Sequence, residues 1–338
     1  MINSAILKRV TLACAISTAF ALAAALSACG GDDNGGSNSS AAAGGSGAPS
    51  TPTPASSTAA ASTFAYQSVA PATSRAQFVA TANSQGAQGF HYLSDFAFGT
   101  TPPLEQISVF VKDAATTWSY EAQNTPVGTT AFVTQASEEG SRGFRWAGAL
   151  AVNGDAFYLY RKDNGSTATF TYQVLAQAST PASYLTQANT QGASGFFNVS
   201  PASSFGDSSV WSVYEKSSAG NSTYGYEIPA LATDDAGFTG QLNSEGARGF
   251  RFRTELFLSG SMVALYAKDL SQTSSFSFTG LDPATTGTAF VQQANGQGAN
   301  GSGLIGGLVL PSSKQQTFYF TPAACTGLLC TAVSLFGI

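Results

Sequence analysis

One segment occurs five times in this chain, and it constrains the fold more than any other feature. The copies begin at residues 78, 132, 184, 238 and 290, align without a gap, and each contains Gly-x-x-Gly at the same offset. They read FVATANSQGAQGF, FVTQASEEGSRGF, YLTQANTQGASGF, FTGQLNSEGARGF and FVQQANGQGANGS. Self-similarity at a nearly fixed period indicates an array of one supersecondary unit. We therefore expect a repeat protein.

Each copy predicts a helix that runs into a turn. Good N-cap residues or glycine stand four positions before each leading aromatic residue: Ser74, Gly128, Thr180, Asp234 and Thr286. Apolar residues at positions i, i+1 and i+4 predict one buried helix face. The first glycine of each Gly-x-x-Gly is expected to end the helix in the left-handed conformation. An asparagine recurs in the last helical turn of four copies, with Ser137 in the second, and we expect it to bond helix to strand.

Strands follow each helix, because apolar and polar residues alternate with period two. Asn153-Gly154 and Ser259-Gly260 are typical of the tight turns that join two such strands. A further strand with an aromatic pair precedes each helix, starting with Phe64 and Tyr66. The predicted fold class is α+β, with five tandem βαββ repeats of about 50 residues, an antiparallel sheet and helices packed on one face.

The repeats resemble small bacterial βαββ domains of unknown function. Their signature is a helix, Gly-x-x-Gly, an aromatic residue and a hairpin that ends in aromatic-x-Lys. This resemblance implies fold rather than activity. The fifth copy departs from it, since Ser302 replaces the aromatic residue. Terminal repeats commonly differ because they cap a stack, so the fifth copy is expected to be a divergent cap. The sequence leaves open whether the units form an open array or a closed ring.

The amino terminus is typical of a secretory signal peptide. Lys8 and Arg9 precede an apolar stretch of about 16 residues, which is short for a transmembrane helix. The sequence Leu26-Ser27-Ala28-Cys29 then resembles the lipobox of bacterial lipoproteins. The resemblance implies cleavage before Cys29 and acylation of that residue, which would anchor the protein to a membrane without spanning it. Residue 30 is Gly rather than Asp, which by the same resemblance favours the outer membrane. An ordinary secreted protein is the alternative.

The predicted division of the chain follows from these features. It is a signal peptide at 1–28, the lipidated Cys29 with a disordered tether at 29–62, repeats at 63–113, 114–163, 164–217, 218–269 and 270–321, and a closing strand with a disulfide loop at 322–338. Cys325 and Cys330 are expected to pair in an oxidising periplasm. Two buried free thiols are the alternative, and zinc is disfavoured because no nearby Cys or His completes four ligands.

Few features point to chemistry. Only 10% of the residues are charged and the net charge is −5, without a Lys/Arg-rich run, so a nucleic-acid partner is disfavoured. His91 is the one histidine and is interpreted as a packing or surface residue. Recurring Asp113, Asp163 and Asp269 predict turns rather than a calcium site. The aromatic pairs predict core packing rather than sugar binding. No catalytic residue, metal or cofactor is predicted.

Positive charge is concentrated in the second and fourth copies. Eight basic residues form the candidate anion-binding set: Arg142, Arg145, Arg161, Lys162, Arg248, Arg251, Arg253 and Lys268. Arg142 and Arg248 lie 106 residues apart, as do Arg145 and Arg251, so the two copies match. They predict two equivalent spots for an anionic glycan or an acidic protein partner. The alternative is a solvated strand face, paired with Glu138, Glu139, Glu245 and Glu255.

The sequence thus predicts a non-enzymatic lipoprotein of the outer membrane that serves as a binding or envelope-structural module. The alternative is a carboxylate-dependent glycan-processing enzyme. Such an enzyme needs two acids about 5 to 9 Å apart in a cleft, and no pair of acids in the sequence is nominated for that role.

Overall fold

The computed structural model describes residues 63–332 of the chain. The predicted signal peptide, the lipidation site Cys29 and the tether lie outside the described residues, as does the segment 333–338. The described residues contain five three-stranded antiparallel sheets and five α-helices. They belong to one compact unit. The predicted α+β class with repeated units is confirmed.

Each repeat has the order strand, helix, strand, strand. The first comprises β1 (Ala65–Val69), α2 (Arg75–Ala87), β2 (His91–Phe98) and β3 (Glu105–Lys112). The second comprises β4 (Trp118–Asn124), α3 (Thr129–Ser141), β5 (Phe144–Val152) and β6 (Asp155–Asp163). The third comprises β7 (Phe170–Ala176), α4 (Pro181–Ala193), β8 (Phe197–Ser203) and β9 (Trp211–Ser217). The fourth comprises β10 (Tyr224–Glu227), α5 (Asp235–Ala247), β11 (Arg251–Leu258) and β12 (Ser261–Asp269). The fifth comprises β13 (Ser275–Leu281), α6 (Gly287–Ala299), β14 (Gly303–Val309) and β15 (Gln315–Ala323), and a short 3₁₀-helix η1 (Leu328–Cys330) follows.

The last strand of each unit lies between the other two, in orders such as β1-β3-β2 and β4-β6-β5. This explains why its sequence is apolar on both faces. Phe157 and Leu159 of β6 point to one face of the sheet and Tyr160 to the other, and all three are fully buried. Strands covered on both sides carry such continuous apolar runs.

The helices begin where their caps predict. Ser74, Thr180, Asp234 and Thr286 each accept a hydrogen bond from the backbone N–H three residues on. Gly128 has no side chain to do so, and its own N–H instead donates to the carbonyl of Phe205 in the third unit, at 2.9 Å. The N-cap predictions are therefore confirmed in four units.

The first glycine of each Gly-x-x-Gly does not have the role expected of it. The first, Gly86 in α2, lies inside the helix, and a Cβ there would lie 2.2 Å from the carbonyl oxygen of Trp118 in β4. The second, Gly89, has φ of +88°. The other units match. A Cβ on the first glycine would lie 2.0 to 2.1 Å from a carbonyl oxygen of the next unit, and the second glycine has φ of +83° to +89°. The prediction of a left-handed first glycine is thus wrong: it permits the close approach of the next strand, and the second glycine makes the turn.

The recurring asparagine joins each helix to the next unit. Asn83 of α2 donates to the Tyr120 carbonyl at 3.0 Å and accepts from the Tyr120 N–H at 2.8 Å. The same pair of bonds is made by Asn189 to Tyr226, Asn243 to Phe278 and Asn295 to Tyr66. The predicted helix-to-strand bond is confirmed in these four units.

A bulge in the first strand of each hairpin leaves a backbone N–H without a ladder partner. In the first unit the register shifts between Tyr92 and Ser94, and the Tyr92 N–H donates to the Tyr120 hydroxyl at 2.7 Å. The same bond is made from Trp146 to Tyr172, from Asn198 to Tyr226 and from Leu304 to Tyr66, each at 2.7 Å. These hydroxyls belong to buried rings, so the aromatic pairs serve the core and the junctions.

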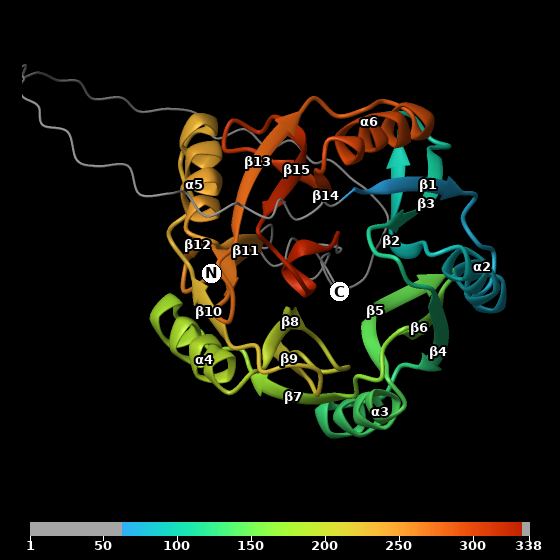
Figure 1. The fold of residues 1–338 in the computed structure, drawn as a ribbon, viewed down its shortest axis with the longest axis horizontal. Coiled ribbons are helices and arrows are strands. Elements are labelled where there is room, and N and C mark those ends of the chain that lie inside the picture. Colours follow the sequence, from blue (N-terminus) through green and yellow to red (C-terminus); the bar gives the residue numbers. More distant parts are fainter. Residues whose placement is uncertain (1–62, 333–338) are drawn as a thin grey trace, which may run out of the picture. The chain divides into compact units, whose positions relative to one another are not determined.

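The last unit contacts the first through the same bonds that join the first unit to the second and the third to the fourth. Tyr66 of β1 binds Asn295 of α6, and its hydroxyl accepts from Leu304 of β14. The Phe64 N–H donates to the Gly298 carbonyl at 3.2 Å. Figure 1 shows the five units following one another in a closed circle, with the helices outside the strands. The repeats therefore close into a ring, and the divergence of the fifth copy does not mark a free end.

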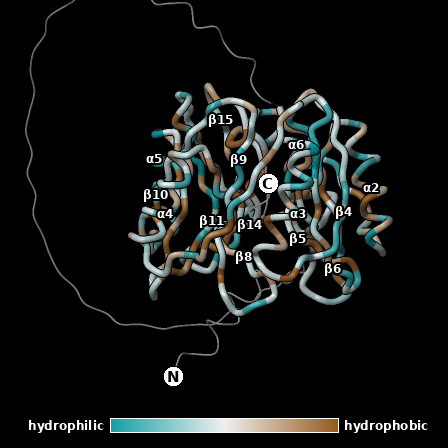
Figure 2. Tube along the Cα trace, turned by 90° about the horizontal axis from the view of Figure 1, so that it is seen from below, coloured by the Kyte–Doolittle hydropathy of each residue, from teal (hydrophilic) through white to brown (hydrophobic). Residues whose placement is uncertain are grey.

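Figure 2 shows the ring at right angles to this view, with hydrophobic and hydrophilic stretches alternating within the units. The apolar residues of all five sheets contribute to two buried clusters that run across unit boundaries. One such boundary is that between Phe290 of α6 and Phe96 of β2, whose ring centroids are 4.6 Å apart. Burial is thus shared between units, as expected for a repeat protein.

Candidate functional site

The structure divides the eight candidate basic residues into three groups. Two small groups lie at the surface of the second and fourth units, and the other four residues are largely buried. In the second unit, Arg142 and Lys162 both lie over the ring of Phe144, at 5.1 and 5.6 Å from its centroid. Arg142 is half exposed and forms ion pairs with Glu121 and Glu139. Two positive charges are thus balanced by two carboxylates.

The fourth unit repeats this arrangement. Arg248 and Lys268 lie over the ring of Phe250, again at 5.1 and 5.6 Å. Arg248 pairs with Glu227 and Glu245, and the Lys268 ammonium donates to the Arg248 carbonyl at 2.7 Å. We call these two groups the exterior spots. Both are electrically balanced.

The lysine of each spot also belongs to the repeated fold. Lys112 and Lys216 lie over Phe90 and Phe196 in the first and third units in the same way. In the fifth unit, Ser302 replaces the aromatic residue and its hydroxyl lies 2.7 Å from that of Thr321, which replaces the lysine. In the fifth copy, both the aromatic residue and the lysine of this contact are therefore replaced, and the two replacements still contact each other.

The remaining four arginines, Arg145, Arg161, Arg251 and Arg253, form what we call the arginine cluster. Arg161, Arg251 and Arg253 are 4%, 2% and 6% exposed, and 17% of the Arg145 side chain is exposed. The solvated strand face offered as an alternative is therefore wrong for these residues. Each guanidinium lies over an aromatic ring: Phe170, Trp118, Phe320 and Phe197, at 5.1, 4.6, 3.7 and 4.9 Å respectively.

Arg161 belongs to a buried chain of polar groups. It donates to His91 Nδ1 at 2.8 Å, and His91 Nε2 lies 3.0 Å from Asp113 Oδ1. Since a guanidinium only donates, Nδ1 must accept, so the imidazole proton of this pair is on Nε2. Burial alone would raise the pKa of Asp113, but His91, the Ala332 N–H and Arg161 together hold it below its usual value.

Arg145 has a carboxylate partner of its own. It forms a buried ion pair with Glu215, whose other oxygen accepts from the Tyr172 hydroxyl at 2.7 Å. Glu215 is 3% exposed. The pKa of Arg145 is raised, because the attraction of Glu215 outweighs burial.

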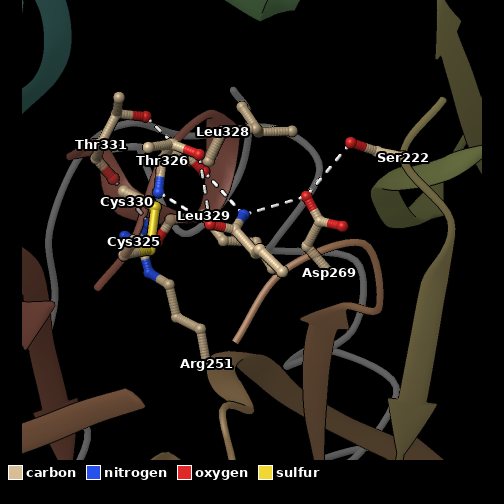
Figure 3. Close-up of a disulfide and its surroundings, with 10 residues drawn as sticks. Ser222, Arg251, Asp269, Cys325, Thr326, Leu328, Leu329, Cys330 and Thr331 are labelled. Carbon is tan, nitrogen blue, oxygen red and sulfur yellow. Dashed lines mark hydrogen bonds between the residues drawn. A yellow bond between two sulfur atoms is a disulfide. The ribbon is translucent and has the colours of Figure 1, made fainter. Parts of the chain in front are cut away.

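Arg251 binds the C-terminal loop, which follows β15. Its Nη1 donates to the carbonyls of Leu329 and Thr331, at 2.8 and 2.6 Å, and Figure 3 shows the side chain pointing toward the loop. The predicted disulfide between Cys325 and Cys330 closes this loop. The closing strand is predicted for the tail from Thr331 onward, and residues 333–338 lie outside the described residues, so it stays a prediction. In the described part, β15 ends at Ala323 and η1 follows within the disulfide loop.

The recurring aspartates are of two kinds. Asp163 and Asp269 accept from the backbone N–H two residues on, at 2.9 Å each, as predicted for turn residues. Asp113 instead turns inward to His91 and accepts from the Ala332 N–H at 2.8 Å. Sequence reasoning missed this role, and it missed Glu215 entirely.

A signal for the buried charges was present in the repeat alignment. The position before the recurring lysine, or before Thr321 in the fifth copy, is occupied by Val111, Arg161, Glu215, Ala267 and Phe320. One Arg and one Glu stand where three copies have apolar residues. Charges at an otherwise apolar repeat position indicate burial with a partner.

Two surface depressions have few acidic residues. One of about 500 Å³ lies between α5 and the β14–β15 hairpin, and the acid that lines it is Asp235, which accepts from Ser312. The other, of about 240 Å³, is lined by Lys216, Tyr224 and small polar residues. Within residues 63–332, no three His, Cys, Asp or Glu side chains gather so as to hold a metal ion. None of the helices described is long and apolar enough to cross a bilayer.

No family model, no curated protein and no solved structure matches this chain. The resemblance of the repeats to small bacterial βαββ domains therefore stays a prediction.

Glu255 offers a test of the electrostatics. It lies on β11, partly buried, and no hydrogen bond or ion pair of its carboxylate is found among the described residues, so burial raises its pKa. A raised carboxyl pKa favours folding at low pH, and this contribution is lost as the pH rises through the raised value. We expect Glu255→Gln to raise the melting temperature by about 1 to 3 °C at pH 7, and by nothing near pH 3. A difference in melting temperature between the two proteins that stays the same from pH 3 to pH 8 would contradict this.

Proposed function

We propose that this chain is an outer-membrane lipoprotein whose repeats form a non-enzymatic binding or structural module of the cell envelope. The lipobox at Leu26 to Cys29 supports the anchor. The proposal includes five βαββ repeats of about 50 residues whose helices pack on one face of their sheets, related to the small βαββ domains that they resemble.

One observation carries the proposal. The polar residues that recur from copy to copy bind the next unit, and the same bonds join α6 to β1. A group that performs chemistry is needed once, whereas a junction is needed at every unit. The repeated residues therefore support a rigid scaffold.

The two exterior spots are the proposed contacts for an anionic glycan or an acidic protein surface. They present the same residue types in the same geometry on two alternate units. Two equal spots on one rigid body favour a partner with repeated negative charges, because the second contact is then intramolecular. Glu121 and Glu227 compete for the arginines of these spots.

Retention of the protein on a carboxylated polysaccharide column tests this proposal. The double variant with Arg142→Ser and Arg248→Ser should elute at a lower salt concentration than the wild type. Glu121→Gln with Glu227→Gln, which frees both arginines, should elute at higher salt. Surface ion pairs contribute about 0 to 1 kcal/mol, so both variants should stay folded. Identical elution of all three proteins would remove the exterior spots from the proposal.

The anchor has a separate test. Replacement Cys29→Ser should abolish incorporation of labelled palmitate and release the protein from the membrane fraction, because the thiol that carries the acyl chain is missing. Replacement Cys325→Ser in the same experiment should leave labelling unchanged. Continued labelling of Cys29→Ser would refute the lipoprotein assignment.

A further inference from the structure

We propose that the arginine cluster is a binding site for one small oxyanion, a carboxylate or phosphate group, held by Arg251 and Arg253 beneath the C-terminal loop. This site is largely buried and is distinct from the exterior spots, so it does not depend on the proposed function. Four observations lead to it.

The charges of the cluster do not balance. Four guanidinium groups are buried there, and the carboxylates that contact the cluster among residues 63–332 are Asp113 and Glu215. His91 accepts from Arg161 and so adds no compensating negative charge. Buried charges are normally paired, because moving an ion out of water is costly. Two positive charges therefore lack a counter-ion.

Among the described residues, Arg251 and Arg253 are the two arginines of the cluster without an ion pair or a hydrogen-bonded link to a carboxylate. Arg145 has Glu215, and Arg161 is linked through His91 to Asp113. The Arg251 Nη1 group binds carbonyls, which are neutral.

The guanidinium of Arg253 makes no hydrogen bond in the described part of the chain and contacts the ring of Phe197. The Nε atoms of Arg161 and Arg251 are buried without an acceptor.

Arg251 and Arg253 lie two residues apart on β11, so both side chains can reach a common ligand. Burial lowers the pKa of Arg251 to about 9, and repulsion from Arg253 contributes to this shift. Burial likewise lowers the pKa of Arg253 to about 10, with repulsion from Arg145 as a smaller cause. An anion between these groups would reverse both shifts, because opposite charge stabilises the protonated form.

The chemistry of the donors defines the ligand class. A guanidinium presents a planar fork of N–H groups that matches two oxygens of a carboxylate or phosphate. The C-terminal loop sets the size limit, since it covers Arg251 and is closed by the Cys325–Cys330 disulfide. Figure 3 shows this loop directly over the Arg251 side chain. These features favour a small anion over a polymer.

Thermal unfolding of the full chain carrying Cys29→Ser, which is water-soluble if the anchor is lost, tests the site. A ligand that binds only the folded state raises the melting temperature in a saturable way. At constant ionic strength, phosphate or acetate should raise it by several degrees over chloride. The salt whose effect on the melting temperature saturates at the lower concentration contains the preferred oxyanion. Equal melting temperatures in all three salts would overturn the proposal.

Variants locate the effect. Arg253→Gln should be more stable than the parent in chloride, because it removes an unpaired buried charge, and should lose the oxyanion-dependent rise. Arg248→Gln, in an exterior spot, should keep that rise in full. If Arg253→Gln does not fold, Arg253→Lys retains the charge without the fork and should reduce the rise. An undiminished rise in the Arg253 variants would place any binding elsewhere and refute the site.

Discussion

Replacement of Gly298 by alanine is expected to destabilise the protein by about 3 kcal/mol or more, because a methyl group there cannot be accommodated. A Cβ at Gly298 would lie 2.0 Å from the carbonyl oxygen of Phe64. That oxygen belongs to the backbone, so α6 and the start of the first unit would have to separate. Urea unfolding followed by tryptophan fluorescence measures the loss as a lower midpoint.

Gly296 provides the matched control, since it lies two residues earlier in the same helix. Nothing lies within 4 Å of a Cβ built there. Alanine is the better helix former, so Gly296→Ala should raise stability by up to about 1 kcal/mol. The comparison also tests ring closure. If β1 were not packed on α6, the two variants would behave alike, and that result would contradict the closed ring.

The second large effect is expected at Glu215. Replacement Glu215→Gln leaves the buried guanidinium of Arg145 without its carboxylate and weakens the acceptor of the Tyr172 hydroxyl. Removal of one partner from a buried ion pair typically costs about 3 to 5 kcal/mol, because the remaining charge is buried unpaired. We expect a fall of this size in the free energy of unfolding, measured by urea denaturation.

Glu121→Gln is the control for charge removal without burial. It breaks the pair with Arg142, which is half exposed, so the expected loss is below about 1 kcal/mol. A similar small loss for both glutamates would show that the Arg145–Glu215 pair contributes no more than a surface contact. It would also weaken the charge argument for the arginine cluster.

Much of the local structure could be predicted from the sequence. Helix starts at Ser74 and Thr180, and the turn at Asn153-Gly154, depend on contacts within a few residues. The disulfide was predictable for the same reason, since its cysteines are five residues apart. Repetition multiplied these signals, because every copy reports on the same local geometry.

Other features could not be predicted because their partners lie far away in the chain. The first glycine of Gly-x-x-Gly is required by a carbonyl about 30 residues further on, and in α6 by Phe64 at the other end of the described residues. The burial of Arg251 and Arg253 involves Phe320 and Phe197, which lie over their guanidinium groups and come from other units.

The sequence by itself determined a repeated βαββ order, the helix starts in four units and a concentration of positive charge in the second and fourth copies. These follow from local hydrogen bonding, hydrophobic periodicity and composition. Only the tertiary structure decided that α6 packs on β1, that Arg142 and Arg248 stay outside, and that Arg251 and Arg253 turn inward. The physical reason is that an arginine has the same propensities in both places, and only its distant neighbours determine whether water or protein surrounds its charge.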